Sequence, residues 1–213
     1  MKIISAQEAA ALVKEGNSVM AGGFLACGSA HSVFAALAKL GTKNLTLIGN
    51  DSAFEGVSYG QLIVNKQVKK LIATHVGTNK ETGRQMSAGE TEVELVPQGT
   101  LAERIRAGGW GLGGILTSTG LGTIVAEGKQ VIEVKGKAYL LEEALRADIA
   151  ILYATRADKY GNLAYDGTTR NFNQVMAMAA DLVIVEVEEM VDVIEPNSVI
   201  TPGVVVDYIV KKE

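Results

Sequence analysis

The sequence predicts an α/β fold: a single open, mostly parallel sheet flanked by helices, with a small hairpin excursion. Continuous apolar runs of strand length alternate along the chain with segments of helical periodicity, which is typical of strands buried on both faces of a parallel sheet. The clearest run, Ala147 to Asp158, is apolar at most of its positions. The pair Lys135-Gly136 interrupts a strand-like segment and predicts the hairpin.

Each predicted element has its own local signal. Ser5 and Glu8 form a capping-box pattern that opens a helix over about Ala6–Lys14. Further helices are predicted at Ser32–Gly41, with Gly41 as C-cap, at Thr100–Gly109, and at Asn171–Ala180, with Asn171 as N-cap. Strands are predicted at Ser18–Gly23, Asn44–Asn50, Val68–Gly77, Thr91–Gly99, both parts of Lys129–Leu145, Ala147–Asp158 and Asp181–Val191.

The composition indicates a globular protein of one domain and argues against nucleic-acid binding. The 213 residues are 47% apolar and 21% charged, the balance of a globular chain with a buried core. We find no internal repeat and no linker, so one domain over residues 1–213 is expected. The net charge of −4, without a long basic run, argues against non-specific binding to nucleic acid.

The compartment is predicted from cysteine usage and hydropathy. The one cysteine, Cys27, cannot form an intramolecular disulfide, which fits a reducing compartment. The first residues do not resemble a signal peptide, and no run of about 18 apolar residues suggests a membrane span. We therefore expect a cytoplasmic protein.

Ligands of open α/β sheets bind at the carboxyl ends of the strands. The candidate positions are therefore those that follow predicted strands: Gly22-Gly23-Phe24, Asn50-Asp51, His75-Val76-Gly77 and Gln98-Gly99-Thr100. The amide of Gln98 suits donation to a developing oxyanion, although a polar cap on the following helix explains it equally well.

The glycine-rich stretch Gly22–Gly28 allows two interpretations. Glycines let backbone N–H groups approach an anion closely, and a following helix adds partial positive charge. The pattern is neither the dinucleotide fingerprint, because Phe24 replaces its second glycine, nor a P-loop. A tight strand-to-helix corner without ligand remains the alternative.

Other candidates carry weaker signals. Cys27 with His31 as its base would make a nucleophile, but a small buried residue is the commoner role. His75 follows a strand and is more often structural, and two histidines with one cysteine argue against a metal site. Three glutamates, Glu90, Glu94 and Glu103, are interpreted as solvated, so no carboxylate stands in a catalytic setting.

The segment from Arg106 to Thr123 is too rich in glycine for a helix or a central strand. Its apolar residues, including Trp110 and Leu112, are poor choices for a solvated loop. We expect this segment to contact a ligand or another chain.

Taken together, these motifs resemble the alpha subunit of family I CoA-transferases. The stretch EGNSVMAGGFLACGSA resembles the family signature, in which an apolar run leads to Gly-Gly-Phe and a later glycine. Two positions depart from it: Glu15 replaces an Asp or Asn, and Ala30 replaces a proline, which loosens the exit of the loop. Further resembling segments follow in the family order at 41–51, 77–114, 117–129, 139–152, 157–173 and 199–210.

The resemblance implies a sugar-phosphate isomerase-like fold and half of an enzyme. In this family a glutamate in a Ser-Glu-Asn-Gly motif of the beta subunit is the nucleophile, and this chain contains no such motif. The implied activity moves CoA between a short-chain acyl-CoA (acetoacetyl-, butyryl- or acetyl-CoA) and a free carboxylate. No bound cofactor is implied, because CoA is a substrate, and the implied assembly is a heterotetramer of two alpha and two beta subunits.

The resemblance also implies roles for individual residues. Gln98 would donate to the oxyanion beside the partner's glutamate. The site for CoA or the acyl group would be lined by Gly22, Gly23, Phe24, Leu25, Ala26, Cys27 and Gly28. Two alternatives stay open: a 3-oxoadipate or succinate transferase subunit, or a non-catalytic ligand-binding α/β protein.

Overall fold

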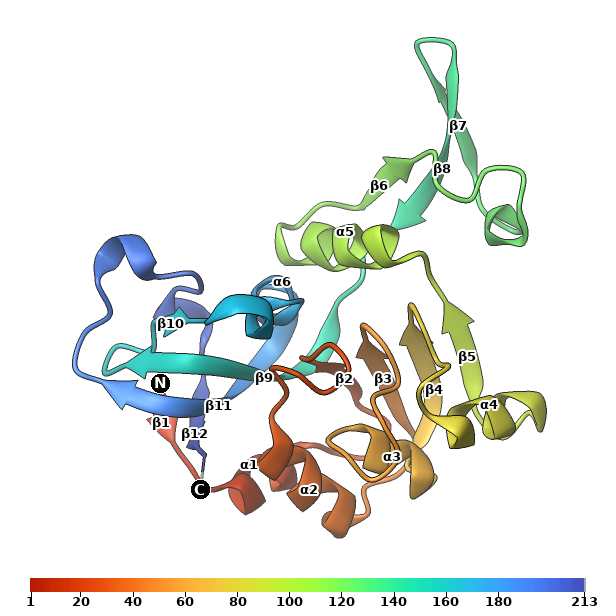
Figure 1. The fold of residues 1–213 in the computed structure, drawn as a ribbon. Coiled ribbons are helices and arrows are strands. Elements are labelled where there is room, and N and C mark those ends of the chain that lie inside the picture. Colours follow the sequence, from red (N-terminus) through yellow and green to blue (C-terminus); the bar gives the residue numbers. More distant parts are fainter. Residues whose placement is uncertain (213) are drawn as a thin grey trace.

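The computed structural model describes residues 1–212 and is built on one open sheet (Figure 1). Its long path is parallel throughout, and β10 (Leu163–Ala164) pairs antiparallel with β9. The predicted fold class is thereby confirmed. The strand order is β1 (Lys2–Ile3), β12 (Tyr208–Lys211), β11 (Ala180–Val191), β9 (Ala147–Asp158), β2 (Ser18–Ala21), β3 (Leu45–Gly49), β4 (Val68–Ala73) and β5 (Glu92–Leu95).

Two apolar layers cover the sheet, one on each face. In β2, Val19 and Ala21 pack into one layer, and Met20 between them packs into the other. This alternation follows from the period of two along a strand. The first layer contains α1 (Ala6–Leu12), α2 (His31–Leu40) and α3 (Gly60–Val64). The second contains α5 (Gln98–Gly109) and α6 (Asn173–Ala177), and α4 (Lys80–Ser87) packs beside α3.

Most predicted helix ends agree with the structure. Ser5 and Glu8 make both hydrogen bonds of the capping box, and Gly41 ends α2 in the left-handed conformation. The prediction for residues 171–180 was wrong in length and in its cap. Only Asn173–Ala177 are helical, and Asn171 lies two residues before the helix because its side chain binds other backbone groups. Within residues 1–212, four short 3-10 helices complete the elements: η1 (Ile124–Ala126), η2 (Gly167–Arg170), η3 (Pro196–Ser198) and η4 (Gly203–Val205).

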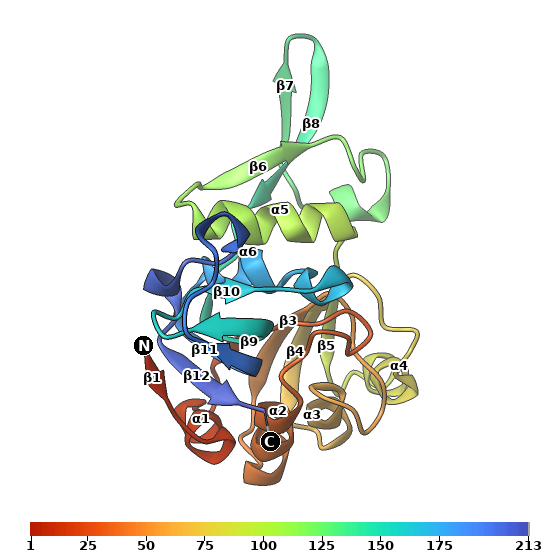
Figure 2. The ribbon, with the colours of Figure 1, turned by 60° about the vertical axis from the view of Figure 1, so that its left-hand side comes forward.

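The predicted excursion is a three-stranded antiparallel arm that stands above α5 and away from the main sheet (Figures 1 and 2). Its strands are β6 (Gly114–Thr117), β8 (Lys137–Glu143) and β7 (Val131–Val134). Lys135 and Gly136 both have positive φ, 51° and 75°, as a two-residue hairpin turn requires. The hairpin prediction is confirmed, whereas β6 was not predicted because glycines surround it.

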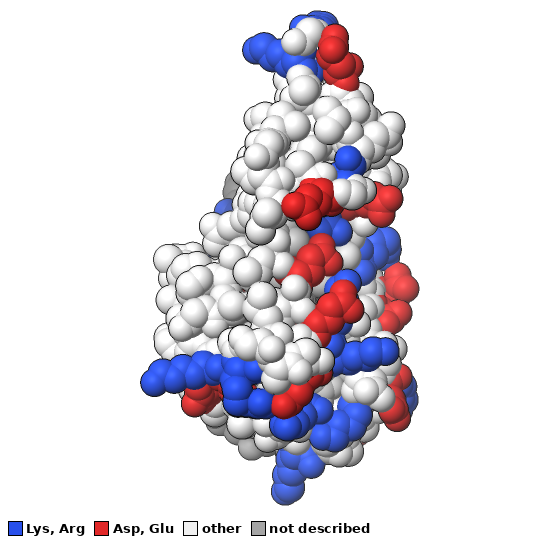
Figure 3. All heavy atoms as spheres, turned by 90° about the vertical axis from the view of Figure 1, so that its right-hand side faces the viewer, with Lys and Arg blue, Asp and Glu red and all other residues white. Residues whose placement is uncertain are grey.

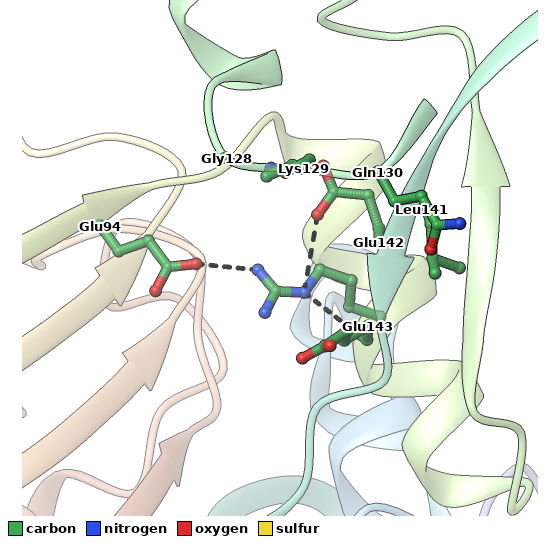
Figure 4. A pocket seen from close by; sticks show the side chains of 8 residues that line it. Glu94, Gly128, Lys129, Gln130, Leu141, Glu142 and Glu143 are labelled. Carbon is green, nitrogen blue, oxygen red and sulfur yellow. Dashed lines mark hydrogen bonds and ion pairs between the residues drawn. The ribbon is translucent and has the colours of Figure 1, made fainter. Parts of the chain in front are cut away.

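Arg104 of α5 joins the root of the arm to the body through ion pairs with Glu94 and Glu142, both labelled in Figure 4. Its guanidinium donates to Glu94 of β5 at 2.9 Å and to the carbonyl of Glu143 of β8 at 2.9 Å. Lys129 pairs with the buried Glu142 at 2.5 Å across the same cavity of about 350 Å³. Both cations thus already pair with carboxylates, so the side chains that line this cavity serve to connect the arm to the body. The interpretation of Glu94 as solvated was wrong, because it is half-buried and ion-paired.

Paired charges also cover the exposed edge of the sheet at β5 (Figure 3). Lys70 of β4 bridges to Glu92 and Glu94, and Arg84 of α4 pairs with Glu81 and Glu90. Charged side chains on an edge strand hinder pairing with another sheet. In residues 1–212, no helix combines the length and the apolar character needed to span a membrane.

Candidate active site at the carboxyl ends of the strands

The predicted site residues converge because β2, β3, β4 and β5 are parallel neighbours. Their carboxyl ends therefore lie along one edge of the sheet. Two contacts demonstrate the convergence: the backbones of Asp51 and His75 form a bridge, and Nε2 of Gln98 donates to Oδ1 of Asn50 at 2.7 Å. The glycine-rich loop that follows β2 joins them, because the Leu25 N–H donates to Asp51 at 2.8 Å.

The tip of this loop is a tight turn. Phe24 and Cys27 exchange two backbone hydrogen bonds, at 3.0 and 2.9 Å. Between them Leu25 and Ala26 have φ values of 48° and 64°. Left-handed backbone at two successive residues with side chains is uncommon and costs free energy, and such strain gathers at functional sites. Phe24 and Leu25 are 43% and 36% exposed, so the tip presents apolar side chains outward.

The glycines flanking the tip allow close packing against residues 168–173. A Cβ on Gly22 would lie 1.9 Å from Oδ1 of Asn173. Gly28 has φ of 65°, and a Cβ there would lie 2.5 Å from the carbonyl oxygen of Thr169. The packed-corner interpretation therefore explains these two glycines, whereas Phe24 and Leu25 at the tip stay exposed.

Two asparagines hold the loop, and neither was among the predicted site residues, although Asn171 was predicted as a helix cap. Asn171 accepts from the Gly23 N–H at 3.1 Å and donates to the Cys27 carbonyl at 3.1 Å. Asn173, which is fully buried, donates to the Gly28 carbonyl at 2.9 Å and accepts from the Tyr153 N–H. Their side chains thus fasten the loop to α6 and β9.

Asp51 is a buried carboxylate with no cation among its hydrogen-bond partners in residues 1–212. Its Oδ2 accepts from the Leu25 N–H at 2.8 Å and from the Asn50 amide at 3.3 Å. Its Oδ1 accepts from the Ala53 N–H at 2.6 Å and from the Tyr59 hydroxyl at 3.0 Å. Because hydrogen bonds to ionised acceptors are strong, these donors replace the water that burial removes.

The hydroxyl of Tyr59 remains a donor at every physiological pH. Burial raises the pKa of this phenol well above its usual value, and the charge and hydrogen bond of Asp51 raise it further. The ring itself is fully buried and packs edge-on against Phe34.

Asp51 also orients the amide of Gln98 through Asn50. An ionised carboxylate only accepts hydrogen bonds, so Asn50 must turn its NH₂ group toward Asp51. Its carbonyl oxygen then faces Gln98, which must present an N–H to it. An amide nitrogen carries two N–H groups. The second N–H of Gln98 therefore remains available at the surface where the carboxyl ends of the strands meet.

Cys27 and His31, the candidate nucleophile and its base, do not interact. Sγ of Cys27 lies 3.6 Å from the Thr168 hydroxyl, and no hydrogen bond among residues 1–212 joins it to His31, which begins α2. The interpretation of these two residues as a nucleophile and its base therefore has no geometric support. Within residues 1–212, no three His, Cys, Asp or Glu side chains lie close enough to hold a metal ion.

Comparison with known proteins defines the class of this site. Residues 3–212 match the coenzyme A transferase family, and the chain belongs to that family. It is 49% identical to the acetate CoA-transferase subunit alpha of Escherichia coli, over 98% of this chain and 96% of that one. It is 50% identical to the acetoacetyl-CoA:acetate/butyrate CoA transferase alpha subunit of Clostridium acetobutylicum, over 99% of this chain and 98% of that one.

Among solved structures, the chain resembles an acyl-CoA transferase from Escherichia coli in a thioester complex with CoA. The TM-score is 0.89 at 25% identity, and the match covers 99% of this chain. This chain spans only 47% of the length of that enzyme.

Asp51→Asn tests the role of the buried carboxylate. Whichever way the new amide turns, its NH₂ group faces an N–H or O–H donor, so we expect a loss of about 2 to 3 kcal/mol of stability. Tyr59→Phe, which removes one donor and leaves the carboxylate, is the matched control and should cost about 1 kcal/mol. Urea unfolding measures both, and hydrogen exchange at the Leu25 amide should quicken in Asp51→Asn. Equal stability of the two variants would contradict the assignment.

Proposed function

We propose that the chain is the alpha subunit of a heteromeric CoA-transferase. The complex moves CoA between a short-chain acyl-CoA (acetoacetyl-, butyryl- or acetyl-CoA) and a free carboxylate. The observation that carries the proposal is the fixed amide of Gln98, which the hydrogen bonds through Asn50 to Asp51 hold at the ligand edge of the sheet. Nearly full-length similarity to two alpha subunits of such transferases supports the choice of acids.

The nucleophile is proposed to come from a beta subunit. Asp51, the carboxylate at the strand ends, is buried and already accepts four hydrogen bonds, so it has no free lone pair to offer a thioester. The chain also spans 47% of the acyl-CoA transferase chain that it resembles. A partner of similar size, in an assembly of two alpha and two beta subunits, would supply the missing half.

In the proposed reaction the partner's glutamate attacks the thioester carbonyl of the acyl-CoA. CoA thiolate leaves, and an acyl-glutamyl anhydride forms. The thiolate then attacks the glutamyl carbonyl, which releases the first acid and leaves a glutamyl-CoA thioester. A second carboxylate reverses these steps. At each attack a carbonyl oxygen becomes negative, and the free N–H of Gln98 is proposed to stabilise that charge.

The loop from Gly22 to Gly28 is proposed to line the site for CoA or the acyl group through its exposed tip. Phe24 and Leu25 offer apolar contact there, and binding energy from parts of CoA remote from the carbonyl helps to position the reacting centre. CoA acts as a substrate and no resident cofactor is proposed. A cytoplasmic location fits the lone cysteine.

The first experiment follows the loss of acetoacetyl-CoA enolate absorbance with acetate or butyrate as acceptor. The chain is assayed alone and with its beta partner, and succinate serves as a competing acid. Activity only in the mixture is expected. Activity of the chain alone would mean that its own residues are catalytic, and no transfer to any acid in the mixture would refute the proposal.

Gln98→Ala should lower kcat of the reconstituted complex by about 10² to 10³, the usual cost of losing one oxyanion donor. Gln7→Ala, in the exposed face of α1, is the matched control and should keep the rate of the unchanged complex. Steady-state kinetics with acetoacetyl-CoA and acetate provide the measurement. A decrease below tenfold would remove Gln98 from the oxyanion role.

We further propose that the surface around Trp110 contacts the beta subunit. Trp110 is 64% exposed in the isolated chain, and Leu112 and Leu116 are 48% and 42% exposed. Trp110 also lines a cavity of about 320 Å³ whose walls include Val175, Met178 and Pro202. Exposed apolar patches of this kind mark interfaces.

Trp110→Asp should therefore weaken assembly with the beta subunit, because burying a charge in an apolar interface is costly. The loss should be about tenfold or more in the assembly constant, since truncation of central aromatic anchors typically costs about 2 kcal/mol or more. Tyr160→Asp, at an aromatic residue that is 62% exposed on another loop, is the control. Sedimentation of the mixed subunits reports the assembly, and unchanged complex formation by Trp110→Asp would exclude this surface.

A further inference from the structure

The β3–α3 loop, residues 52–58, lies beside the glycine-rich loop at the carboxyl ends of the strands. Asp51 joins the two loops, because its carboxylate accepts from one N–H group of each, at 2.8 and 2.6 Å. Hydrogen bonds also lead from Asp51 through Asn50 to Gln98. The β3–α3 loop is therefore a close neighbour of the amide that is proposed to stabilise the oxyanion.

Hydrogen bonds hold both ends of the β3–α3 loop. Near its start, the Ala53 carbonyl accepts from the Thr78 hydroxyl at 2.8 Å. At its end, the buried hydroxyl groups of Ser58 and Ser29 lie 2.5 Å apart and join the loop to the residues before α2. The tip between these contacts is thus a preformed surface, which loses little conformational entropy when a partner binds.

The tip of the β3–α3 loop presents two apolar side chains and one carboxylate to the outside. Phe54 is 41% exposed and Val57 is 37% exposed, although the residues on either side of them are buried or glycine-flanked. Between them Glu55 is exposed, and no ion pair among residues 1–212 includes it. Exposed aromatic residues on a preformed surface are typical anchors of protein interfaces.

The position of Gln98 indicates which partner covers this tip. In the proposed reaction a glutamate of the beta subunit reaches the carbonyl that Gln98 stabilises. A stable interface buries about 800 Å² of each partner, a patch of about 20 to 30 residues. A partner that reaches Gln98 therefore also covers its neighbours, and three successive hydrogen bonds connect Gln98 to the β3–α3 loop. The beta subunit is the occupant that this geometry favours.

From these observations we propose that the β3–α3 loop docks against the beta subunit and that Phe54 is its anchor. The partner offers an apolar pocket to Phe54 and Val57, and a cationic side chain to Glu55. This inference rests on the proposed function and adds a contact surface beside the reacting centre. It is separate from the surface around Trp110, which lies at the other end of α5 from Gln98.

The first test titrates a fixed concentration of this chain with the beta subunit and measures CoA transfer from acetoacetyl-CoA to acetate. Phe54→Ala should raise the concentration of beta subunit that gives half-maximal activity by about tenfold or more, as truncation of an aromatic anchor does. With the beta subunit in excess, kcat and KM for acetoacetyl-CoA should return to the values of the unchanged complex. A changed KM that excess beta subunit does not restore would place Phe54 against the substrate and overturn the proposal.

Leu40→Ala is the matched control. Leu40 is 55% exposed at the last residue of α2, and α2 leads from the glycine-rich loop back to the amino ends of the strands. This variant should keep the midpoint of the titration. An equal midpoint for Phe54→Ala would overturn the inference. Sedimentation of the chain alone adds a second check, since a dimer that Phe54→Ala separates would make a second copy the occupant and also overturn it.

Glu55→Lys tests the charge of the tip. Opposite a cationic side chain of the partner, the reversed charge should raise the midpoint about tenfold at about 0.05 M salt and only about twofold at about 0.5 M, because salt screens exposed charges. Equal effects at both salt concentrations would overturn the cation assigned to the partner.

Failure of this inference is distinguishable from failure of the proposed function. If the unchanged complex transfers CoA and the variants at Phe54 and Glu55 share its midpoint, the β3–α3 loop lies outside the interface. If the mixture of subunits transfers CoA to none of the acids, the proposed function fails and the inference fails with it.

Discussion

The buried carboxylate of Asp51 is the constraint on which the rest of the site depends. A charge removed from water without a cation needs hydrogen-bond donors on its oxygens, and the chain must bring them from several places. These donors are the backbone of the glycine-rich loop, the backbone after β3, the Tyr59 phenol and the Asn50 amide. The burial of the Asp51 carboxylate is unfavourable without these donors, and the donors hold the loop in place. Through Asn50, the same carboxylate also fixes the direction of the Gln98 amide.

The same loop illustrates how strain and support are balanced. Leu25 and Ala26 hold a left-handed turn that glycine would adopt more readily. Contacts from outside the turn supply the free energy that offsets the cost of this conformation. Asp51 holds its first half, and Asn171 holds both of its ends. The turn keeps its apolar side chains exposed because its backbone is already satisfied. If the loop binds a ligand as proposed, its backbone is already ordered and loses little conformational entropy on binding.

The sequence predicted the main sheet well because its strands are buried on both faces and read as continuous apolar runs. It also placed Gly22, Asn50, Asp51 and Gln98 at one edge, since strand ends meet in a parallel sheet. It gave Asn171 only the role of a helix cap and Asn173 no role, because the loop groups that they bind lie more than 140 residues away in the chain. It also missed the polar helix α4 and the glycine-flanked β6, because neither has an apolar period. Side-chain pairing between distant segments has no local signal, and the site is built from such pairs.

The strand order has a consequence for how the protein is made. β2 lies between β3, which follows it closely, and β9, which is more than 120 residues downstream. A nascent chain that ends before residue 147 therefore has an unpaired β2 edge. Asn171 and Asn173, which hold the glycine-rich loop, leave the ribosome later still. β1 cannot pair until β12, near the other end of the chain, has been synthesised. Contacts between such distant segments form slowly. The edge where the carboxyl ends of β2, β3, β4 and β5 meet is thus among the last parts of the molecule to take shape during synthesis.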